Sequence, residues 1–412
     1  MCHAYGKTLI FVISGNFRWI FIAEETYMNG PYRQMQTRTV LAALAIAVLL
    51  VACAAPKERE LSRIVPVGAF LSNGGRPNDP DNVDPRLARW GLIGAMEQAL
   101  GRRIQVLEIS GGGQYGAFGA GFLNGWSGTG TRPRFDLVTG ISTGALLATH
   151  AFLGTPADDR VLKDIYTGID KHNIYENAIL GALFGGPALN RTERLAEVIE
   201  RVITPEVLAR VAAEFDENRR LFVAATNLDY NQIWIFSMGL IAKHGGEDGL
   251  ALYRKVLHAA ASPPVVFPPV EIEGHLFADA AVRENLLVMG LFGGSRIEHP
   301  GNSEPGEVYV IVNGVDRAPP AAVPNALEPI ASDTLNAILG GRMHTTLVLS
   351  FAGARIHGYG FNLVSLPDEV PISGNALAFE REEMRRVYEA GYRLGQQPDP
   401  WLHRPAPSDQ LG

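Results

Sequence analysis

The serine best placed to do chemistry in this sequence lies between two glycines. The motif G-I-S-T-G at residues 140–144 follows a strand-like run at 135–139 and precedes a helix-like run at 145–148. A G-x-S-x-G motif between a strand and a helix is typical of a nucleophile elbow, in which the glycines permit a sharp turn and a close approach of strand and helix. We therefore predict that Ser142 presents its hydroxyl as a nucleophile.

A glycine-rich loop precedes this motif in the chain. Residues 104–109 have the pattern of a short β-branched strand, the loop S-G-G-G-Q-Y-G occupies 110–116, and a small, apolar, helix-like run follows at 117–126. A strand, a glycine loop and a helix in succession leave bare backbone N–H groups at the positive end of a helix. Such groups suit a developing anion, so the sequence predicts an anion-binding loop here.

Three motifs in this order resemble the signature of the patatin-like phospholipase family. They are G-G-G-x-x-G at residues 111–116, G-x-S-x-G at 140–144, and Asp279 followed by small residues. The resemblance extends from about Ile104 to a charged, helix-like run at 378–394. Three motifs in the same order are much more specific than any one of them.

The resemblance implies a three-layer α/β/α fold with a mostly parallel central sheet. The strand-like runs at 221–226 and 233–237 have the pattern of a strand pair around residues 227–231, and a late strand-like run follows at 308–312. Along the chain, strand-like and helix-like runs alternate with short connectors. This alternation is typical of a sheet that is covered by helices on both faces. We expect the hydrolase domain to occupy residues 85–400 and a tail to follow at 401–412.

The resemblance also implies a Ser–Asp dyad that needs no histidine. Asp279 would accept the proton of Ser142, and N–H groups of the glycine loop would hold the tetrahedral oxyanion. The reaction implied is hydrolysis of a lipid acyl ester, of the phospholipase A or lysophospholipase type, through an acyl-Ser142 intermediate. The glycines carried over are Gly111, Gly112 and Gly113 for the oxyanion hole and Gly116, Gly140 and Gly144 for the motifs.

Two positions depart from the family's pattern. Tyr115 stands where many members carry a basic residue, so the electrostatic help of that cation would be missing. Ala280 follows Asp279 where the family usually has glycine. If the turn after Asp279 requires a positive φ, Ala280 would be strained and Asp279 displaced.

Three other interpretations use the same residues. A Ser-His-Asp triad would need a histidine later in the chain, and the candidates are His299, His344 and His357. The spacing of the glycines in 111–116 also fits a dinucleotide-binding loop, but Asp136 opens the next strand and would lie at the wrong end of the sheet. The third interpretation is a catalytically inactive lipoprotein that serves as a binding module.

The N-terminal region has the pattern of a targeting segment. Residues 40–52 form an apolar run that ends at Cys53, and this run has the length of the apolar part of a signal peptide. The sequence L-V-A-C resembles the lipobox of bacterial lipoproteins, whose Cys is lipidated. We expect a lipoprotein signal peptide at 35–52, lipidation at Cys53 and a tether at 53–84. Residues 1–34 are then a start-site artefact or a disordered extension.

Composition narrows the possible partners. The 412 residues carry a formal net charge of -7, so no basic surface for nucleic acid is expected. Two cysteines exclude a disulfide framework and a cysteine-based zinc site, and no loop has calcium-ligand spacing, so we expect no metal and no cofactor. The expected partners are membrane lipids or acyl esters. We expect the protein to be lipid-anchored in the bacterial cell envelope, at the periplasmic or surface side of the outer membrane.

Overall fold

The computed structural model describes residues 12–14, 18–20, 59–71, 85–177, 190–287, 305–314, 323, 325 and 327–405. The chain divides into two compact units, Met1–Lys57 and Glu58–Gly412. In the first unit the described strands are β1 (Val12–Ser14) and β2 (Arg18–Ile20), which pair antiparallel. The expected signal peptide and Cys53 lie outside the described residues.

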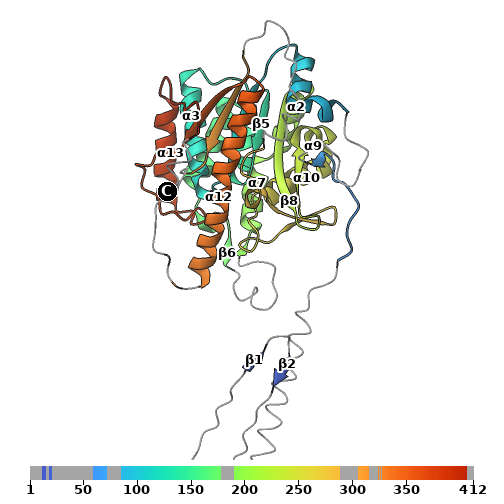
Figure 1. Cartoon of the computed structure of the whole chain (residues 1–412), viewed down its shortest axis with the longest axis vertical. Helices are drawn as coiled ribbons and strands as arrows, with labels where there is room; N and C mark the ends of the chain where they lie inside the picture. The colour runs from blue at the N-terminus through green and yellow to red at the C-terminus, as the bar shows by residue number, and fades with distance from the viewer. Residues whose placement is uncertain are drawn as a thin grey trace, which may run out of the picture. The chain divides into compact units, whose positions relative to one another are not determined.

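A nine-stranded sheet forms the centre of the second unit (Figure 1). Its main path runs β10-β11-β8-β5-β4-β12-β13, while β9 pairs with β8 and with β3. The strands are β3 (Ala69–Leu71), β4 (Gln105–Ile109), β5 (Leu137–Gly140), β8 (Arg220–Asn227), β9 (Gln232–Ser237), β10 (Val270–Ile272), β11 (His275–Asp279), β12 (Glu307–Val312) and β13 (Gly360–Ser365). The consecutive pairs from β8 through β5, β4 and β12 to β13 are parallel, as the sequence predicts. The remaining pairs of this sheet are antiparallel: β8 pairs with β9 and with β11, β11 pairs with β10, and β9 pairs with β3.

Side chains of the central strands alternate between two hydrophobic cores. In β4, Leu107 and Ile109 face the larger core, whereas Val106 faces the smaller one. Strand β8 repeats the pattern, with Leu221 in the larger core and Phe222 in the smaller. Successive side chains of a strand point to opposite faces, so each core covers one face of the sheet. The structure therefore has the three α/β/α layers that the resemblance implies.

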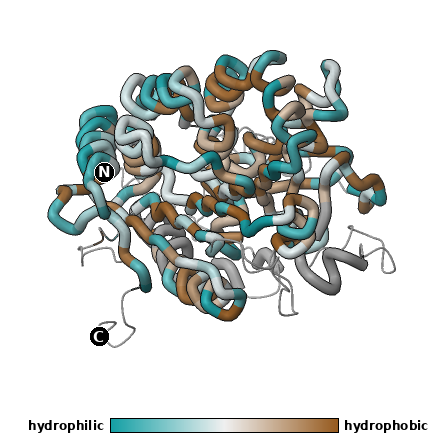
Figure 2. The backbone as a smooth tube through the Cα atoms, turned by 90° about the horizontal axis from the view of Figure 1, so that it is seen from above, coloured by the Kyte–Doolittle hydropathy of each residue, from teal (hydrophilic) through white to brown (hydrophobic). Residues whose placement is uncertain are grey.

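Helices cover both faces of the sheet. The larger core lies under α3 (Gly116–Thr129), α4 (Thr143–Leu153), α5 (Pro156–Gly168), α7 (Glu193–Val202), α8 (Pro205–Asp216), α9 (Met238–His244), α10 (Gly246–Ala260) and α13 (Arg381–Gly395). The smaller core lies under α2 (Pro85–Leu100) and α12 (Leu327–Ile356). Short elements complete the unit: η1 (Gly113–Tyr115), η2 (Lys171–Asn173), η3 (Ala280–Val282) and the strand pair β6 (Glu176–Asn177) and β7 (Asn190–Arg191). In Figure 2 the helices carry hydrophilic and hydrophobic stretches side by side, as helices that bury one face do.

Helices α3 and α13 pack unusually closely (Figure 1). A Cβ atom on Gly121 of α3 would lie 2.0 Å from the backbone oxygen of Tyr388 in α13. In the opposite direction, a Cβ atom on Gly391 of α13 would lie 2.2 Å from the oxygen of Phe118. Glycine at both positions lets the two backbones touch, and this contact fixes the helix that follows the glycine loop.

The tether expected at 53–84 is not irregular throughout. Residues 69–71 form β3, which pairs antiparallel with β9 and extends the sheet. Gly68 makes the approach possible, because a Cβ atom there would lie 2.9 Å from the oxygen of Ser237. Upstream, Nη1 of Arg59 lies 2.9 Å from Oδ1 of Asp229. Residues 59–71 of this segment are therefore anchored to the hydrolase domain.

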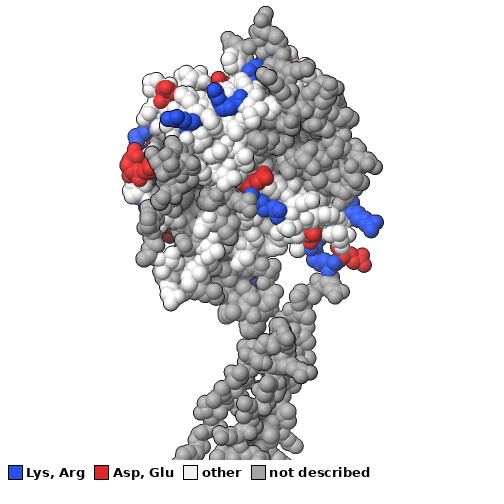
Figure 3. Space-filling model, viewed as in Figure 1, with Lys and Arg blue, Asp and Glu red and all other residues white. Residues whose placement is uncertain are grey.

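Two further features concern the distribution of surface charge and the hydrophobicity of the described helices. On the face that Figure 3 shows, the coloured acidic and basic side chains lie in small groups of mixed sign. None of the described helices is both long enough and apolar enough to cross a membrane.

Candidate active site

Ser142 lies at a sharp turn between β5 and α4. Its backbone has φ 56° and ψ -126°, a conformation that costs on the order of 1–3 kcal/mol for a residue with a side chain. The two motif glycines make the turn possible. A Cβ atom on Gly140 would lie 2.3 Å from the oxygen of Gly144, and one on Gly144 would lie 2.2 Å from the oxygen of Ile109. Ser142 thus lies on a sharp turn between a strand and a helix, the local geometry that a nucleophile elbow requires.

Asp279 reaches the turn because two strands share one edge of β8. Strand β9 occupies one edge of β8 over most of its length, so β5 and β11 lie end to end along the other edge. Gly140, the last residue of β5, pairs with Val223. Asp279, the last residue of β11, pairs with Ala225, two residues further along β8. Asp279 therefore lies where β5 would continue if the chain did not turn at Ser142.

Ser142 and Asp279 are neighbours in the buried site. The Asp279 carboxyl group lies close enough to the Ser142 hydroxyl for that hydroxyl to affect its pKa, and its Oδ1 accepts the N–H of Ala281 at 2.8 Å. Only 9% of Ser142 and 1% of Asp279 is exposed. Burial raises the pKa of Asp279 from its ordinary 3.8 to about 7, although the nearby Ser142 hydroxyl and the N–H of Ala281 lower it in part. A carboxyl group with a pKa near neutrality can both take up and return a proton.

The alanine after Asp279 does not disturb the turn. Ala280 has a negative φ, so this position does not require glycine. Its side chain is buried in the smaller core, and η3 begins at this residue. The departure from the family's pattern at Ala280 therefore leaves Asp279 in place.

The glycine loop lies beside Ser142 with its N–H groups unused. A Cβ atom on Gly111 would lie 3.1 Å from the Cβ of Ser142. Gly112 and Gly113 have φ values of 151° and 55°, which favour glycine. In the part of the chain that the structure describes, the N–H groups of these three glycines donate no hydrogen bond. The loop thus offers donors to an oxyanion, while the buried Tyr115 supplies no cation.

Asn313 holds this loop in position and is missed by the sequence analysis. Its backbone N–H donates to Oγ of Ser110 at 2.9 Å, and its Nδ2 donates to the backbone oxygen of Ser110 at 2.8 Å. Its Oδ1 accepts the N–H of Gly119 in α3 at 3.0 Å. Asn313 thereby ties the end of β12 to both sides of the loop. The signal that could have found it is a polar residue directly after a buried parallel strand, where ligand-facing residues gather.

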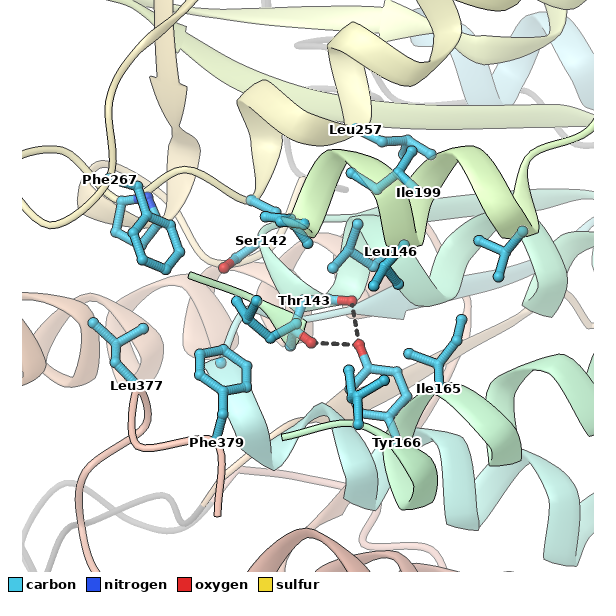
Figure 4. Close-up of a pocket in the computed structure, with 18 of the residues that line it drawn as sticks. Ser142, Thr143, Leu146, Ile165, Tyr166, Ile199, Leu257, Phe267, Leu377 and Phe379 are labelled. Carbon is cyan, nitrogen blue, oxygen red and sulfur yellow. Dashed lines mark hydrogen bonds between the residues drawn. The ribbon is translucent and has the colours of Figure 1, made fainter. Parts of the chain in front are cut away.

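An apolar pocket opens beside Ser142 (Figure 4). It encloses about 730 Å³, part of it open to solvent. Its lining comes largely from α4, α5, α7 and α10 and from the segments 263–267 and 377–379, and it includes Leu146, Ile165, Ile199, Leu257, Phe267 and Phe379. Figure 4 shows Ser142 and Phe267 toward one end of this pocket and Ile165 and Ile199 toward the other. Aliphatic and aromatic walls of this kind fit a hydrocarbon chain.

A buried hydroxyl pair fixes the wall next to the nucleophile. Oγ1 of Thr143 and the hydroxyl oxygen of Tyr166 lie 2.5 Å apart, and the Tyr166 hydroxyl also donates to the backbone oxygen of Thr143 at 3.3 Å. Dashed lines in Figure 4 mark the two contacts. Burial raises the pKa of the Tyr166 hydroxyl well above its ordinary value, although the hydrogen bond with Thr143 lowers it in part, so this wall stays uncharged. Gly116 makes room for the pair, since a Cβ atom there would lie 2.2 Å from Oγ1 of Thr143.

Several residues of the alternative interpretations lie elsewhere. The backbone oxygen of His357 accepts a hydrogen bond from Arg103 at 3.0 Å, before the start of β4 and so at the opposite end of the sheet from the glycine loop. Asp136 lies at that same end, 2.6 Å from Nη2 of Arg102, so it cannot serve a nucleotide at the loop. His299 lies outside the described residues. Over the described ranges, no group of three His, Cys, Asp or Glu side chains could hold a metal ion.

The raised pKa of Asp279 predicts a cost to stability that grows with pH. Between about pH 4 and pH 7 the folded protein keeps a proton on Asp279 that the unfolded chain has released, and above pH 7 the folded protein must bury the charge. The full pKa difference corresponds to at most about 4 kcal/mol. Asp279→Asn keeps an acceptor oxygen without the charge. We expect its advantage in unfolding free energy over the wild type to grow by up to this amount from pH 4 to pH 8.

Urea denaturation of both proteins, followed by tryptophan fluorescence at the two pH values, measures this difference. Asp368→Asn is the matched control, because it removes a carboxyl group that is exposed. A difference between Asp279→Asn and the wild type that stays constant with pH would contradict the raised pKa.

Comparisons with known proteins place these features in a family. The model of the patatin-like phospholipase family matches residues 107–292, which include the glycine loop, Ser142 and Asp279. Uncharacterized protein R571 of Acanthamoeba polyphaga mimivirus is 25% identical over 180 residues, which are 43% of this chain and 58% of that protein, so the chain spans little more than half of this relative's length. Among solved structures, VipD from Legionella pneumophila is 12% identical with a TM-score of 0.31, over 84% of this chain and 72% of that one. Residues 107–292 of this chain therefore form a patatin-like phospholipase domain.

Proposed function

We propose that this protein hydrolyses lipid acyl esters, with Ser142 as the nucleophile and Asp279 as the general base. The observation that carries the proposal is the strand pairing that brings the buried Asp279 to the Ser142 turn beside an apolar pocket. The family match supports lipid acyl hydrolysis in general terms. From that match we assign the reaction to the phospholipase A or lysophospholipase type.

The first half-reaction forms an acyl-enzyme. Oγ of Ser142 attacks the carbonyl carbon of the ester while its proton moves to Asp279. The carbonyl oxygen becomes an oxyanion, which the unused N–H groups of Gly111, Gly112 and Gly113 stabilise. When the ester C–O bond breaks, the leaving alcohol takes the proton from Asp279, and the acyl group remains on Ser142.

The second half-reaction releases the acid. A water molecule gives a proton to Asp279 and attacks the acyl carbon. The second tetrahedral intermediate breaks its bond to Oγ of Ser142, which takes the proton back from Asp279. A free fatty acid leaves, and both side chains return to their starting states.

The apolar pocket supports a lipid as the acyl donor. A chain bound through the ester at Ser142 would lie against residues such as Leu146, Leu257 and Phe267. Each methylene buried there contributes about 0.8 kcal/mol to binding. This gain is available only to a hydrophobic acyl group, so the pocket favours fatty acyl esters over esters of small polar acids.

Substitution of the dyad tests the proposal. We expect purified full-length protein to hydrolyse nitrophenyl butyrate, and we expect Ser142→Ala and Asp279→Asn each to lower kcat by at least about a thousandfold. Both changes remove a group that every step of the reaction uses. Phospholipid vesicles, with released fatty acid as the readout, then test the lipid substrate.

Histidine variants distinguish the dyad from a triad. Under the dyad, His299→Ala and His344→Ala keep wild-type turnover. Loss of turnover in either variant, with the protein still folded by circular dichroism, would assign the proton transfer to a histidine. A folded wild type that hydrolyses neither the butyrate ester nor the vesicles would favour an inactive binding module.

We also propose that a lipid on Cys53 holds the enzyme at a membrane of the bacterial cell envelope. The apolar run and the lipobox-like sequence before Cys53 support this anchor. A tethered enzyme meets membrane substrates at a raised effective concentration without needing a basic surface. The outer membrane, on its periplasmic or surface side, is the proposed site.

Replacement of Cys53 tests the anchor. In a bacterial host supplied with a labelled fatty acid, we expect wild-type protein to incorporate the label and to sediment with the membranes. Cys53→Ser should do neither, because serine offers no thiol for lipidation. Cys2→Ser is the control and should behave as wild type. Label on the Cys53→Ser protein would rule out lipidation at this position.

A further inference from the structure

A second cavity lies behind the apolar pocket. It is bordered by α5, α7 and α8, and its lining includes Val161, Asp164, Val207 and Arg210. Ser142, Phe267 and the other residues near the nucleophile do not line it. The two cavities are therefore distinct spaces, and only the first of them reaches the nucleophile.

Four aliphatic side chains separate the two cavities. Ile165 lies in the last turn of α5 and Ile169 directly follows that helix, while Val198 and Val202 lie one turn apart on α7. All four line the apolar pocket on one side and the second cavity on the other. We call these four residues the partition. Figure 4 places Ile165 toward the end of the apolar pocket away from Phe267.

We propose that the partition sets the longest acyl chain that the enzyme accepts, a role that rests on the lipid acyl hydrolysis proposed above. A chain whose carboxyl carbon lies at Ser142 runs along the apolar pocket and meets the partition at its far end. The barrier is only one layer of side chains thick, since each of its members faces both spaces. Shortening these side chains would join the two cavities and make room for more methylenes.

The far side of the partition differs in character from the apolar pocket. Asp158, which lines the second cavity, is 1% exposed and accepts hydrogen bonds from Arg210 at 2.5 Å and from His150, whose Nδ1 lies 3.0 Å away. Burial raises the pKa of Asp158, but its hydrogen bonds outweigh burial and hold that pKa well below its ordinary value, so the group is charged. Within the described structure Nε2 of His150 is buried without a hydrogen-bond partner. A methyl group in contact with these polar side chains would gain no free energy from burial. An acyl chain can therefore extend only into the part of the second cavity that lies next to the partition.

The expected effect follows from the cost of leaving a methylene in water. Burial of one methylene contributes about 0.8 kcal/mol, or roughly fourfold in kcat/KM for each carbon that fits. In the wild type this increase should stop at the chain length that reaches the partition. With the partition shortened, two further methylenes would raise the preference for the longer ester on the order of tenfold.

The test compares nitrophenyl esters from butyrate to palmitate, presented in the same mixed micelles. The variants are Ile165→Ala, Val202→Ala and their combination, in the full-length protein. Val207→Ala is the matched control, because Val207 lines only the second cavity. We expect the optimum of kcat/KM to move to longer esters in the partition variants and not in the control. An optimum that stays in place in the double variant, or moves equally in Val207→Ala, overturns the proposal.

A binding measurement makes the result independent of turnover. Fatty acids of the same lengths are titrated against Ser142→Ala protein with the partition intact or shortened, and displacement of a fluorescent fatty acid gives the Kd. A longer preferred chain after shortening supports the partition even if the ester assay shows no hydrolysis. The same preferred length in both proteins contradicts it. Lack of ester hydrolysis by wild type would instead count against the proposed function.

Discussion

The active site depends on one edge of β8 that two strands share end to end. Because β9 covers the opposite edge, β5 and β11 must meet along the remaining one, and their facing ends carry Ser142 and Asp279. The chain leaves the sheet at Ser142, and the vacated position is where Asp279 arrives. Because β4 and β12 pair in parallel, the glycine loop that follows β4 and Asn313, which follows β12, lie next to each other at the same end of the sheet. Strand pairing therefore brings together the proposed nucleophile, the proposed base and the proposed oxyanion site.

This arrangement carries two energetic costs that packing must offset. Ser142 has a positive φ, which is a strained conformation. Glycine at the two neighbouring motif positions permits this turn, because a Cβ atom at either position would overlap backbone atoms. The buried Asp279 has a raised pKa, so its charged form is destabilised at the pH where a base must be unprotonated. Both costs fall on the proposed catalytic residues, and a sheet with a core on each face holds them in place. Such a local loss of stability is common where a protein needs a reactive site.

Local patterns predicted the parts of the site that depend on nearby residues. The elbow around Ser142, the glycine loop and the hairpin of β8 and β9 each follow from a few consecutive residues, and the structure has them. Asp279 was identified through resemblance, since nothing local separates it from other carboxylates. Asn313 and the partition were not predicted, because their roles arise from contacts between distant segments. The strand β3 was also missed, because glycine and proline dominate its surroundings. Nor was α12 predicted, since Gly340 and Gly341 interrupt its helical pattern.

The most direct test of the central claim is labelling of Ser142 by a fluorophosphonate, which phosphonylates a serine only where a base activates it. Intact mass and peptide mapping would locate the adduct, and its rate would be followed across pH. If Asp279 activates Ser142, one adduct forms, on Ser142, at a rate that rises with pH through about 7, and this labelling is lost in Asp279→Asn. Labelling of Ser142 at an unchanged rate in Asp279→Asn, or no adduct on Ser142 in the wild type, would contradict this activation.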